Sequence, residues 1–120
     1  MKSFFKEEII YEIRIICSPY RPVGEDPETE LRNNIDQATR ACRLAVSKGL
    51  IPLAPHLYFY TVFWTDNDPQ ERRLGQQAGK EWMRYVSEVW IVGDRISSGM
   101  EEELKLARLR GIPIKKVKIP

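Results

Sequence analysis

The sequence predicts one α/β domain of 120 residues, a three-layer sandwich in which helices cover both faces of a four-stranded parallel sheet. Short apolar runs rich in isoleucine and valine alternate with longer segments whose apolar residues recur at helical spacing. Strands that alternate with helices of this length pair in parallel. No repeat, linker or low-complexity tract divides residues 1–120, so we expect a single domain.

The first strand and the first helix are predicted within residues 11–49. YEIRIICSPY (11–20) is an isoleucine-rich run that stops at a Ser-Pro breaker, as a buried strand often does. Asp26 and Pro27 then form a typical helix start, an oxygen-bearing cap followed by proline at the first helical position. Gly49 is a natural end for this helix.

The remaining elements continue the alternation. LIPLAPHLYF (50–59) predicts a second strand that runs into an aromatic loop. Residues 68–86 predict a helix that begins at an Asp-Pro cap and is interrupted by Gly75 and Gly79. A third strand, a third helix and a fourth strand follow, at EVWIVGD (88–94), within residues 93–114 and at IPIKKVKI (112–119). We expect the strands to lie in the order 2-1-3-4.

Composition excludes several classes of protein. The formal net charge of +2 is too small to indicate a nucleic-acid partner, and we assign Lys115, Lys116 and Lys118 to the protection of an edge strand. No apolar run is long enough to span a membrane, and the first residues do not read as a signal peptide. A cytoplasmic protein with free thiols at Cys17 and Cys42 is therefore expected.

Three loops should meet where a parallel sheet binds its ligands, outside the carboxyl ends of the strands. These loops are 18–21, 56–59 and 94–99, and all of them carry polar or aromatic side chains. With a single histidine in the chain, a metal site is not expected, and neither is a redox cofactor.

Four residues of these loops are candidates for contact with a ligand. Tyr20 and Arg21 follow the first strand, and Arg21 is either a bidentate partner of phosphate or a solvated loop residue. His56 is either a binding residue or a structural hydrogen-bonding residue. Asp94 contacts a sugar hydroxyl or simply caps its loop.

An aromatic cluster follows the second strand. Stacking on a base, covering the site and forming a subunit interface are all possible roles, and we favour an interface in a homodimer or larger assembly. The cluster comprises Tyr58, Phe59, Tyr60, Phe63 and Trp64.

Three consecutive glutamates begin the last helix. On a helical wheel Glu103 falls inside the apolar stripe, whereas Glu101 and Glu102 fall outside it. Glu103 therefore either lines a cavity or only complements the positive end of the helix dipole. The stripe consists of Met100, Leu104, Leu106 and Ala107.

A Ser-Ser-Gly turn precedes these glutamates. Ser97 or Ser98 can cap the helix. Alternatively, the hydroxyl groups and the backbone N–H groups of this turn, which includes Gly99, can hold an anion such as phosphate.

The segment SSGMEEE (97–103), followed by GIPI (111–114), resembles the signature of the nucleoside 2-deoxyribosyltransferase superfamily. The resemblance continues through IICSPYR, LAPHLYF, ERRLG and VWIVGD, so it covers most of the chain. It is strongest to the small phage and bacterial members that are grouped as domains of unknown function. It implies a flavodoxin- or Rossmann-like fold and a site that includes the turn from Ser97 to Met100.

The resemblance also implies a reaction. Glu103 stands at the position of the nucleophile that attacks the anomeric carbon of the sugar. Ser97 stands where the related 2′-deoxynucleoside 5′-phosphate N-hydrolases have a phosphate-binding serine, which favours a nucleotide over a nucleoside. The expected function is hydrolysis or transfer at the N-glycosidic bond of a (deoxy)nucleoside 5′-monophosphate.

One departure keeps a second function open. Active members usually carry an aspartate in the helix before the third strand, whereas GKEWMR (79–84) contains none. Glu81 is a possible substitute. The alternative is a non-catalytic protein that binds a nucleotide or a nucleotide sugar with a degenerate active site.

Overall fold

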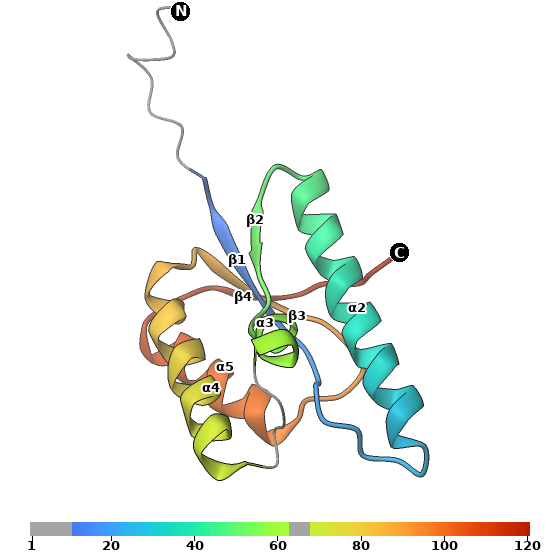
Figure 1. Cartoon of the computed structure of the whole chain (residues 1–120). Helices are drawn as coiled ribbons and strands as arrows, with labels where there is room; N and C mark the ends of the chain where they lie inside the picture. Colours follow the sequence, from blue (N-terminus) through green and yellow to red (C-terminus); the bar gives the residue numbers. More distant parts are fainter. Residues whose placement is uncertain (1–10, 63–67) are drawn as a thin grey trace, which may run out of the picture.

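The computed structural model describes residues 11–62 and 68–120, and for residues 59–62 it describes the backbone only. Its centre is a four-stranded sheet in which every strand pair is parallel, in the order β2-β1-β3-β4 (Figure 1). The strands are β1 (Ile13–Cys17), β2 (Ile51–Leu53), β3 (Glu88–Ile91) and β4 (Ile114–Lys116). The predicted fold class and strand order are therefore confirmed.

The helices cover both faces of this sheet. Helix α2 lies on one face, whereas α4 and α5 lie on the other (Figure 1). The helices are α2 (Pro27–Ser47), α3 (Pro55–Val62), α4 (Pro69–Trp82), which the 3-10 turn η1 (Met83–Tyr85) extends, and α5 (Ser98–Leu109). Asp26 and Asp68 accept hydrogen bonds from backbone N–H groups at the starts of α2 and α4, as their cap-then-proline patterns predict.

Two core layers follow from the alternation of side chains along β1. Ile15 and Cys17 point toward α5 and pack with Met100 and Leu104, all of them 0–1% exposed. Ile16 points to the opposite face, where the alanines of α2 let that helix approach the sheet closely. A central strand that is buried on both faces accounts for the isoleucine-rich run in the sequence.

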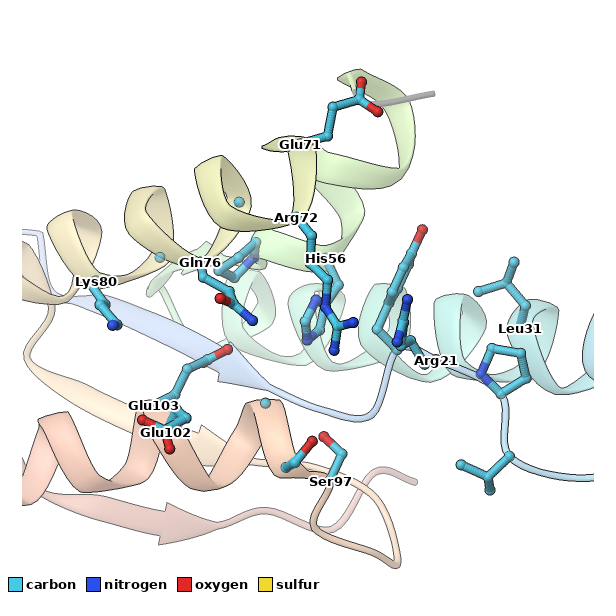
Figure 2. Close-up of a pocket in the computed structure, with 18 of the residues that line it drawn as sticks. Arg21, Leu31, His56, Glu71, Arg72, Gln76, Lys80, Ser97, Glu102 and Glu103 are labelled. Atoms are coloured by element: carbon cyan, nitrogen blue, oxygen red, sulfur yellow. The ribbon is translucent and has the colours of Figure 1, made fainter. Parts of the chain in front are cut away.

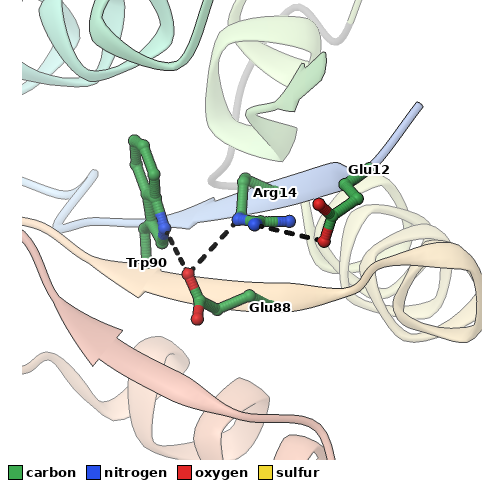
Figure 3. A network of polar contacts seen from close by, with 4 residues as sticks. All are labelled: Glu12, Arg14, Glu88 and Trp90. Atoms are coloured by element: carbon green, nitrogen blue, oxygen red, sulfur yellow. Dashed lines mark hydrogen bonds and ion pairs between the residues drawn. The ribbon is translucent and has the colours of Figure 1, made fainter. Parts of the chain in front are cut away.

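A polar network crosses the sheet near the amino ends of β1 and β3 (Figure 3). The guanidinium Nε of Arg14 lies 3.2 Å from Glu88 Oε1, which also accepts a 2.8 Å hydrogen bond from the indole N–H of Trp90. Glu12 adds a 3.4 Å contact to the same guanidinium. Because the Arg14 side chain is only 12% exposed, these carboxylates compensate a charge that has lost most of its water.

Two expectations about the middle of the chain are wrong. His56 lies in the first turn of helix α3, whereas a loop was expected there after the second strand, which ends at Leu53. The physical reason is Pro55, whose fixed φ suits the first position of a helix and whose missing N–H costs nothing there. Helix α4 also continues through Gly75 and Gly79 instead of being interrupted by them.

Smaller features agree with the sequence. Gly49 and Gly111 adopt φ of +77° and +69° just after α2 and α5, where a left-handed residue ends a helix. Cys17 and Cys42 are free thiols. Lys115 and Lys116 are exposed on β4, which is an edge strand. Within residues 11–62 and 68–120, no helix is long and apolar enough to cross a membrane.

Candidate functional site

A cavity of about 820 Å³ lies beyond the carboxyl ends of β1 and β3, between helices α4 and α5 (Figure 2). Segments that are far apart in the sequence line it together, including the loop after β1, the start of α3 and the first turns of α5. This is the edge of the sheet where the sequence predicts a ligand. The lining residues are Tyr20, Arg21, Pro22, Val23, Leu31, Pro55, His56, Glu71, Arg72, Gly75, Gln76, Gly79, Lys80, Arg95, Ser97, Ser98, Gly99, Glu102 and Glu103.

Glu103 has the most unusual environment in the cavity wall. It is half-buried, and its Oε2 atom is shielded from solvent with no hydrogen-bond partner among the described residues. Burial raises the pKa of this carboxyl group from 4.5 to about 7, and a hydrogen bond from the Cys17 thiol opposes the rise. Near neutral pH the group is therefore close to half ionised, which suits a carboxyl group that changes its bonding during a reaction.

The two neighbouring glutamates differ from Glu103 as the helical wheel predicts. Glu101 and Glu102 are both exposed. Glu102 nevertheless contributes to the cavity wall, whereas Glu101 does not. The three acids thus occupy three environments: a shielded wall position, an exposed wall position and open solvent.

The turn before α5 directs hydrogen-bond donors at the cavity. The Ser97 hydroxyl oxygen caps the helix by accepting a hydrogen bond from the Met100 N–H at 3.3 Å, and its own hydrogen remains a possible donor. The N–H groups of Ser98 and Gly99 lie in the first helical turn, where the helix supplies no acceptor for them. Capping and anion binding are therefore compatible roles for this turn.

His56 is held as a neutral ring. Burial lowers its pKa from 6.5 to about 4, against a hydrogen bond to the Ser18 backbone that favours the protonated form. The ring also stacks on Tyr20, with the ring centroids 5.1 Å apart and the planes 20° apart. Because the hydrogen bond to a carbonyl oxygen uses one ring N–H, the other nitrogen of the neutral ring is an acceptor.

Cationic side chains outnumber carboxylates around the cavity. Arg21, Arg72, Lys80 and Arg95 line it, against Glu71, Glu102 and Glu103. Arg95 also donates a 2.8 Å hydrogen bond to the backbone carbonyl of Arg21, which ties the loop before α5 to the loop after β1. The raised pKa of Glu103 reduces the opposing negative charge further, so the cavity favours an anionic ligand.

The predicted site residues do not all meet in the cavity. The wall contains Tyr20, Arg21, His56, Ser97, Ser98, Gly99 and Glu103. Asp94 is exposed outside it. Met100 is fully buried in the core, and its sulfur accepts a weak hydrogen bond from the Ser97 N–H, so it supports the turn from beneath.

Helix α4 supplies residues that sequence reasoning missed. Arg72, Gln76 and Lys80 recur every four residues on the side that Figure 2 shows across the cavity from Glu103 and Ser97. Gly75 and Gly79 share the cavity wall, and a Cβ atom at Gly79 would meet nothing within 4 Å. The two glycines leave this helix surface bare and so enlarge the cavity. In the sequence, the four-residue spacing of Gly75 and Gly79 within a capped helix was the signal that could have identified this surface.

The possible substitute for the missing aspartate is not in the cavity. Glu81 is exposed, and its carboxylate lies 3.3 Å from the Nε atom of Arg84 in a surface ion pair. The residue before it, Lys80, is part of the cavity wall instead. At this position helix α4 therefore presents the Lys80 cation to the cavity, and not the Glu81 carboxylate.

The aromatic cluster is described only in part. Tyr58 is 51% exposed, and its ring makes an edge contact with Trp82, at a centroid distance of 5.4 Å. The side chains of Phe59 and Tyr60, and all of Phe63 and Trp64, lie outside the described residues.

Comparison with protein-family models gives one match, to the family described as "Domain of unknown function (DUF7768)", over residues 12–117. This match covers all the strands and helices described above, so the chain belongs to that family. Neither the curated proteins nor the solved structures contain a significant match.

Proposed function

We propose that this member of the DUF7768 family cleaves the N-glycosidic bond of a (deoxy)nucleoside 5′-monophosphate, with Glu103 as the nucleophile. The observation that carries the proposal is the position of Glu103. Its shielded, incompletely bonded carboxyl group lies in the wall of a cavity that also contains the donors of the Ser97–Gly99 turn. An unsatisfied buried polar atom beside an anion-binding turn is typical of a site that a substrate completes.

In the proposed reaction, the ionised Glu103 attacks C1′ of the sugar while the bond from C1′ to the base breaks. The base leaves with the bonding electron pair and takes a proton from water. The resulting glycosyl ester is then cleaved by water at C1′, which restores the carboxylate, or by a second base in a transfer reaction. Neutral His56 offers a hydrogen-bond acceptor to a hydroxyl or amino group of the substrate, and Arg21 or Arg95 can pair with its phosphate.

The phosphate assignment predicts a difference between a nucleotide and its nucleoside. At saturating concentration, a deoxynucleoside 5′-monophosphate should raise the melting temperature by about 5 °C more than the matching nucleoside does. Ser97→Ala should remove most of this difference, because it deletes the hydroxyl donor of the turn. Differential scanning fluorimetry measures both quantities.

Ser97 is also a helix cap, so its loss will lower the melting temperature without ligand as well. Asp26→Ala is the matched control, since Asp26 caps α2 and does not line the cavity. This control should lose stability but keep the full difference between nucleotide and nucleoside. Equal shifts for the two ligands with the unaltered protein would refute the phosphate assignment.

A second candidate function is binding without catalysis. The specific observation in its favour is the composition of the α4 surface, where Gln76 and Lys80 line the cavity and Glu81 does not. With Gln76 and Lys80 rather than a carboxylate across from Glu103, the cavity still complements a nucleotide or a nucleotide sugar. A test for release of free base from nucleotides separates the two functions.

The expected assembly is a homodimer or larger oligomer. Exposed Tyr58 beside the remaining aromatic residues of 58–64 favours burial against a second copy of the chain. Sedimentation velocity at micromolar concentration should then give a species of at least twice the 14.0 kDa chain mass. A single species of chain mass would contradict the assembly and leave the cavity unaffected.

A further inference from the structure

Cys17 is the last residue of β1 and lies directly beneath the proposed nucleophile. Its side chain is 0% exposed, in the core layer that also contains Met100 and Leu104 on either side of Glu103 in helix α5. The thiol hydrogen-bonds with the Glu103 carboxyl group. Strand β1 and helix α5 therefore meet in one polar contact within an otherwise apolar layer.

We propose that Cys17 is a positioning residue, whose donated S–H hydrogen bond holds the Glu103 carboxylate in place at the cavity wall. This inference rests on the proposed function for its consequence in catalysis, but not for the interaction itself. A thiol suits this place because it packs like a small apolar side chain and still offers a weak donor. Alanine would lose the donor, whereas serine would keep it.

The direction of the proton assignment follows from charge. Burial and the neighbouring carboxylate both raise the pKa of the Cys17 thiol, so it stays protonated and can only donate to an ionised Glu103. The same hydrogen bond lowers the pKa of Glu103 against the effect of burial. Cys17 thus increases the ionised fraction of Glu103 near neutral pH and restricts its orientation.

Three polar side chains of the cavity wall lie elsewhere around Glu103. Ser97, Gln76 and Lys80 lie on the opposite or lateral walls of the cavity (Figure 2). They are accessible to a ligand, whereas Cys17 is not. Cys17 therefore acts through Glu103 rather than on the substrate.

The test is a titration of Glu103 in the ligand-free protein, followed by NMR of its ¹³C-labelled side-chain carboxyl group and assigned with Glu103→Gln. Cys17→Ala should raise the pKa of Glu103 by about half a pH unit, because a weak donor is lost. Cys17→Ser should restore the original value or lower it. Cys42→Ala, at a half-buried cysteine that packs against the opposite core layer, is the matched control and should leave Glu103 unchanged.

A second measurement needs no change at Cys17. The infrared S–H stretching band of the unaltered protein should shift as Glu103 ionises between about pH 5 and pH 9, and Glu103→Gln should abolish that shift. An unchanged pKa of Glu103 in Cys17→Ala, or an S–H band that is independent of pH, would overturn the inference. Neither measurement requires the protein to be an enzyme, so failure of the proposed function is a separate result.

If base release occurs, its pH profile gives the catalytic consequence. Cys17→Ala should move the rising limb of kcat toward higher pH by the same amount that NMR gives for Glu103. A purely structural role would lower kcat at every pH without moving this limb. Recovery of the original profile in Cys17→Ser would identify the donor as the cause.

Discussion

Glu103→Gln should abolish the release of free base from deoxynucleoside 5′-monophosphates, with a loss of about a thousandfold or more in kcat. Glutamine has nearly the shape of glutamate, so the cavity should keep its form, but an amide is not a competent nucleophile. No other carboxylate can replace it, because Glu102 and Glu71 belong to other parts of the wall and a misplacement of about 1 Å already costs much of the rate. Chromatography of the free base measures the reaction.

The matched control is Glu101→Gln, an exposed acid on the same helix that is not part of the cavity wall. It removes an exposed carboxylate from the first turn of α5, so it tests whether charge near the helix N-terminus affects the reaction. Its rate should stay within about twofold of the unaltered protein. An equal loss in both variants would show that the charge of the helix, and not a nucleophile, governs the reaction.

Binding must be measured beside the rate. Glu103→Gln should still bind the nucleotide, because the donors of the Ser97–Gly99 turn are untouched. If the unaltered protein binds nucleotides but releases base from none of them, it is a non-catalytic binding protein. If it binds none, both proposed functions are wrong.

The sequence predicts most of the fold because the determining features are local. The Asp-Pro caps, the glycines after α2 and α5 and the isoleucine-rich β1 each express a backbone preference that tertiary structure does not overturn. The position of Glu103 was also accessible, since helical periodicity alone separates it from Glu101 and Glu102.

The parts that sequence reasoning missed depend on which helix surfaces face each other. The run 50–59 reads as a strand followed by an aromatic loop, whereas its second half belongs to helix α3, which packs against α2 and α4. The contact of Cys17 with Glu103 joins residues from opposite ends of the chain, so no local pattern reports it. The bare surface at Gly75 and Gly79 becomes part of a cavity wall only because α5 lies across from it, and the sequence does not show this arrangement.

The raised pKa of Glu103 should make the stability of the folded protein depend on pH. The free energy of unfolding of Glu103→Gln, relative to the unaltered protein, should rise by about 3 kcal/mol as the pH increases from 4.5 to 7. The sign follows from proton binding. The pKa of Glu103 is 4.5 in an unfolded chain and about 7 in the folded one. Between these values the folded state holds a proton that the unfolded state has released, so raising the pH favours unfolding.

His56 acts in the opposite direction over nearly the same range. Its pKa falls from 6.5 in the unfolded chain to about 4 in the folded one, so lowering the pH through this interval favours unfolding. In the unaltered protein the two effects largely cancel between pH 4.5 and 6.5. Glu103→Gln removes the effect of Glu103 and leaves that of His56, so the free energy of unfolding of this variant should rise as the pH increases across this interval. His56→Gln should leave only the effect of Glu103, so the free energy of unfolding of this variant should decline as the pH rises.

Urea denaturation at several pH values between 4.5 and 7.5 measures all three proteins, and Glu101→Gln is again the control. The control removes an exposed carboxylate from the same helix, so it measures the effect of net charge alone. If Glu101→Gln and Glu103→Gln show the same pH dependence, net charge explains the result and the burial of Glu103 does not. If the free energy of unfolding rises with pH in Glu103→Gln and not in Glu101→Gln, the rise measures the free-energy cost of keeping the Glu103 carboxyl group at the cavity wall, whatever the ligand is.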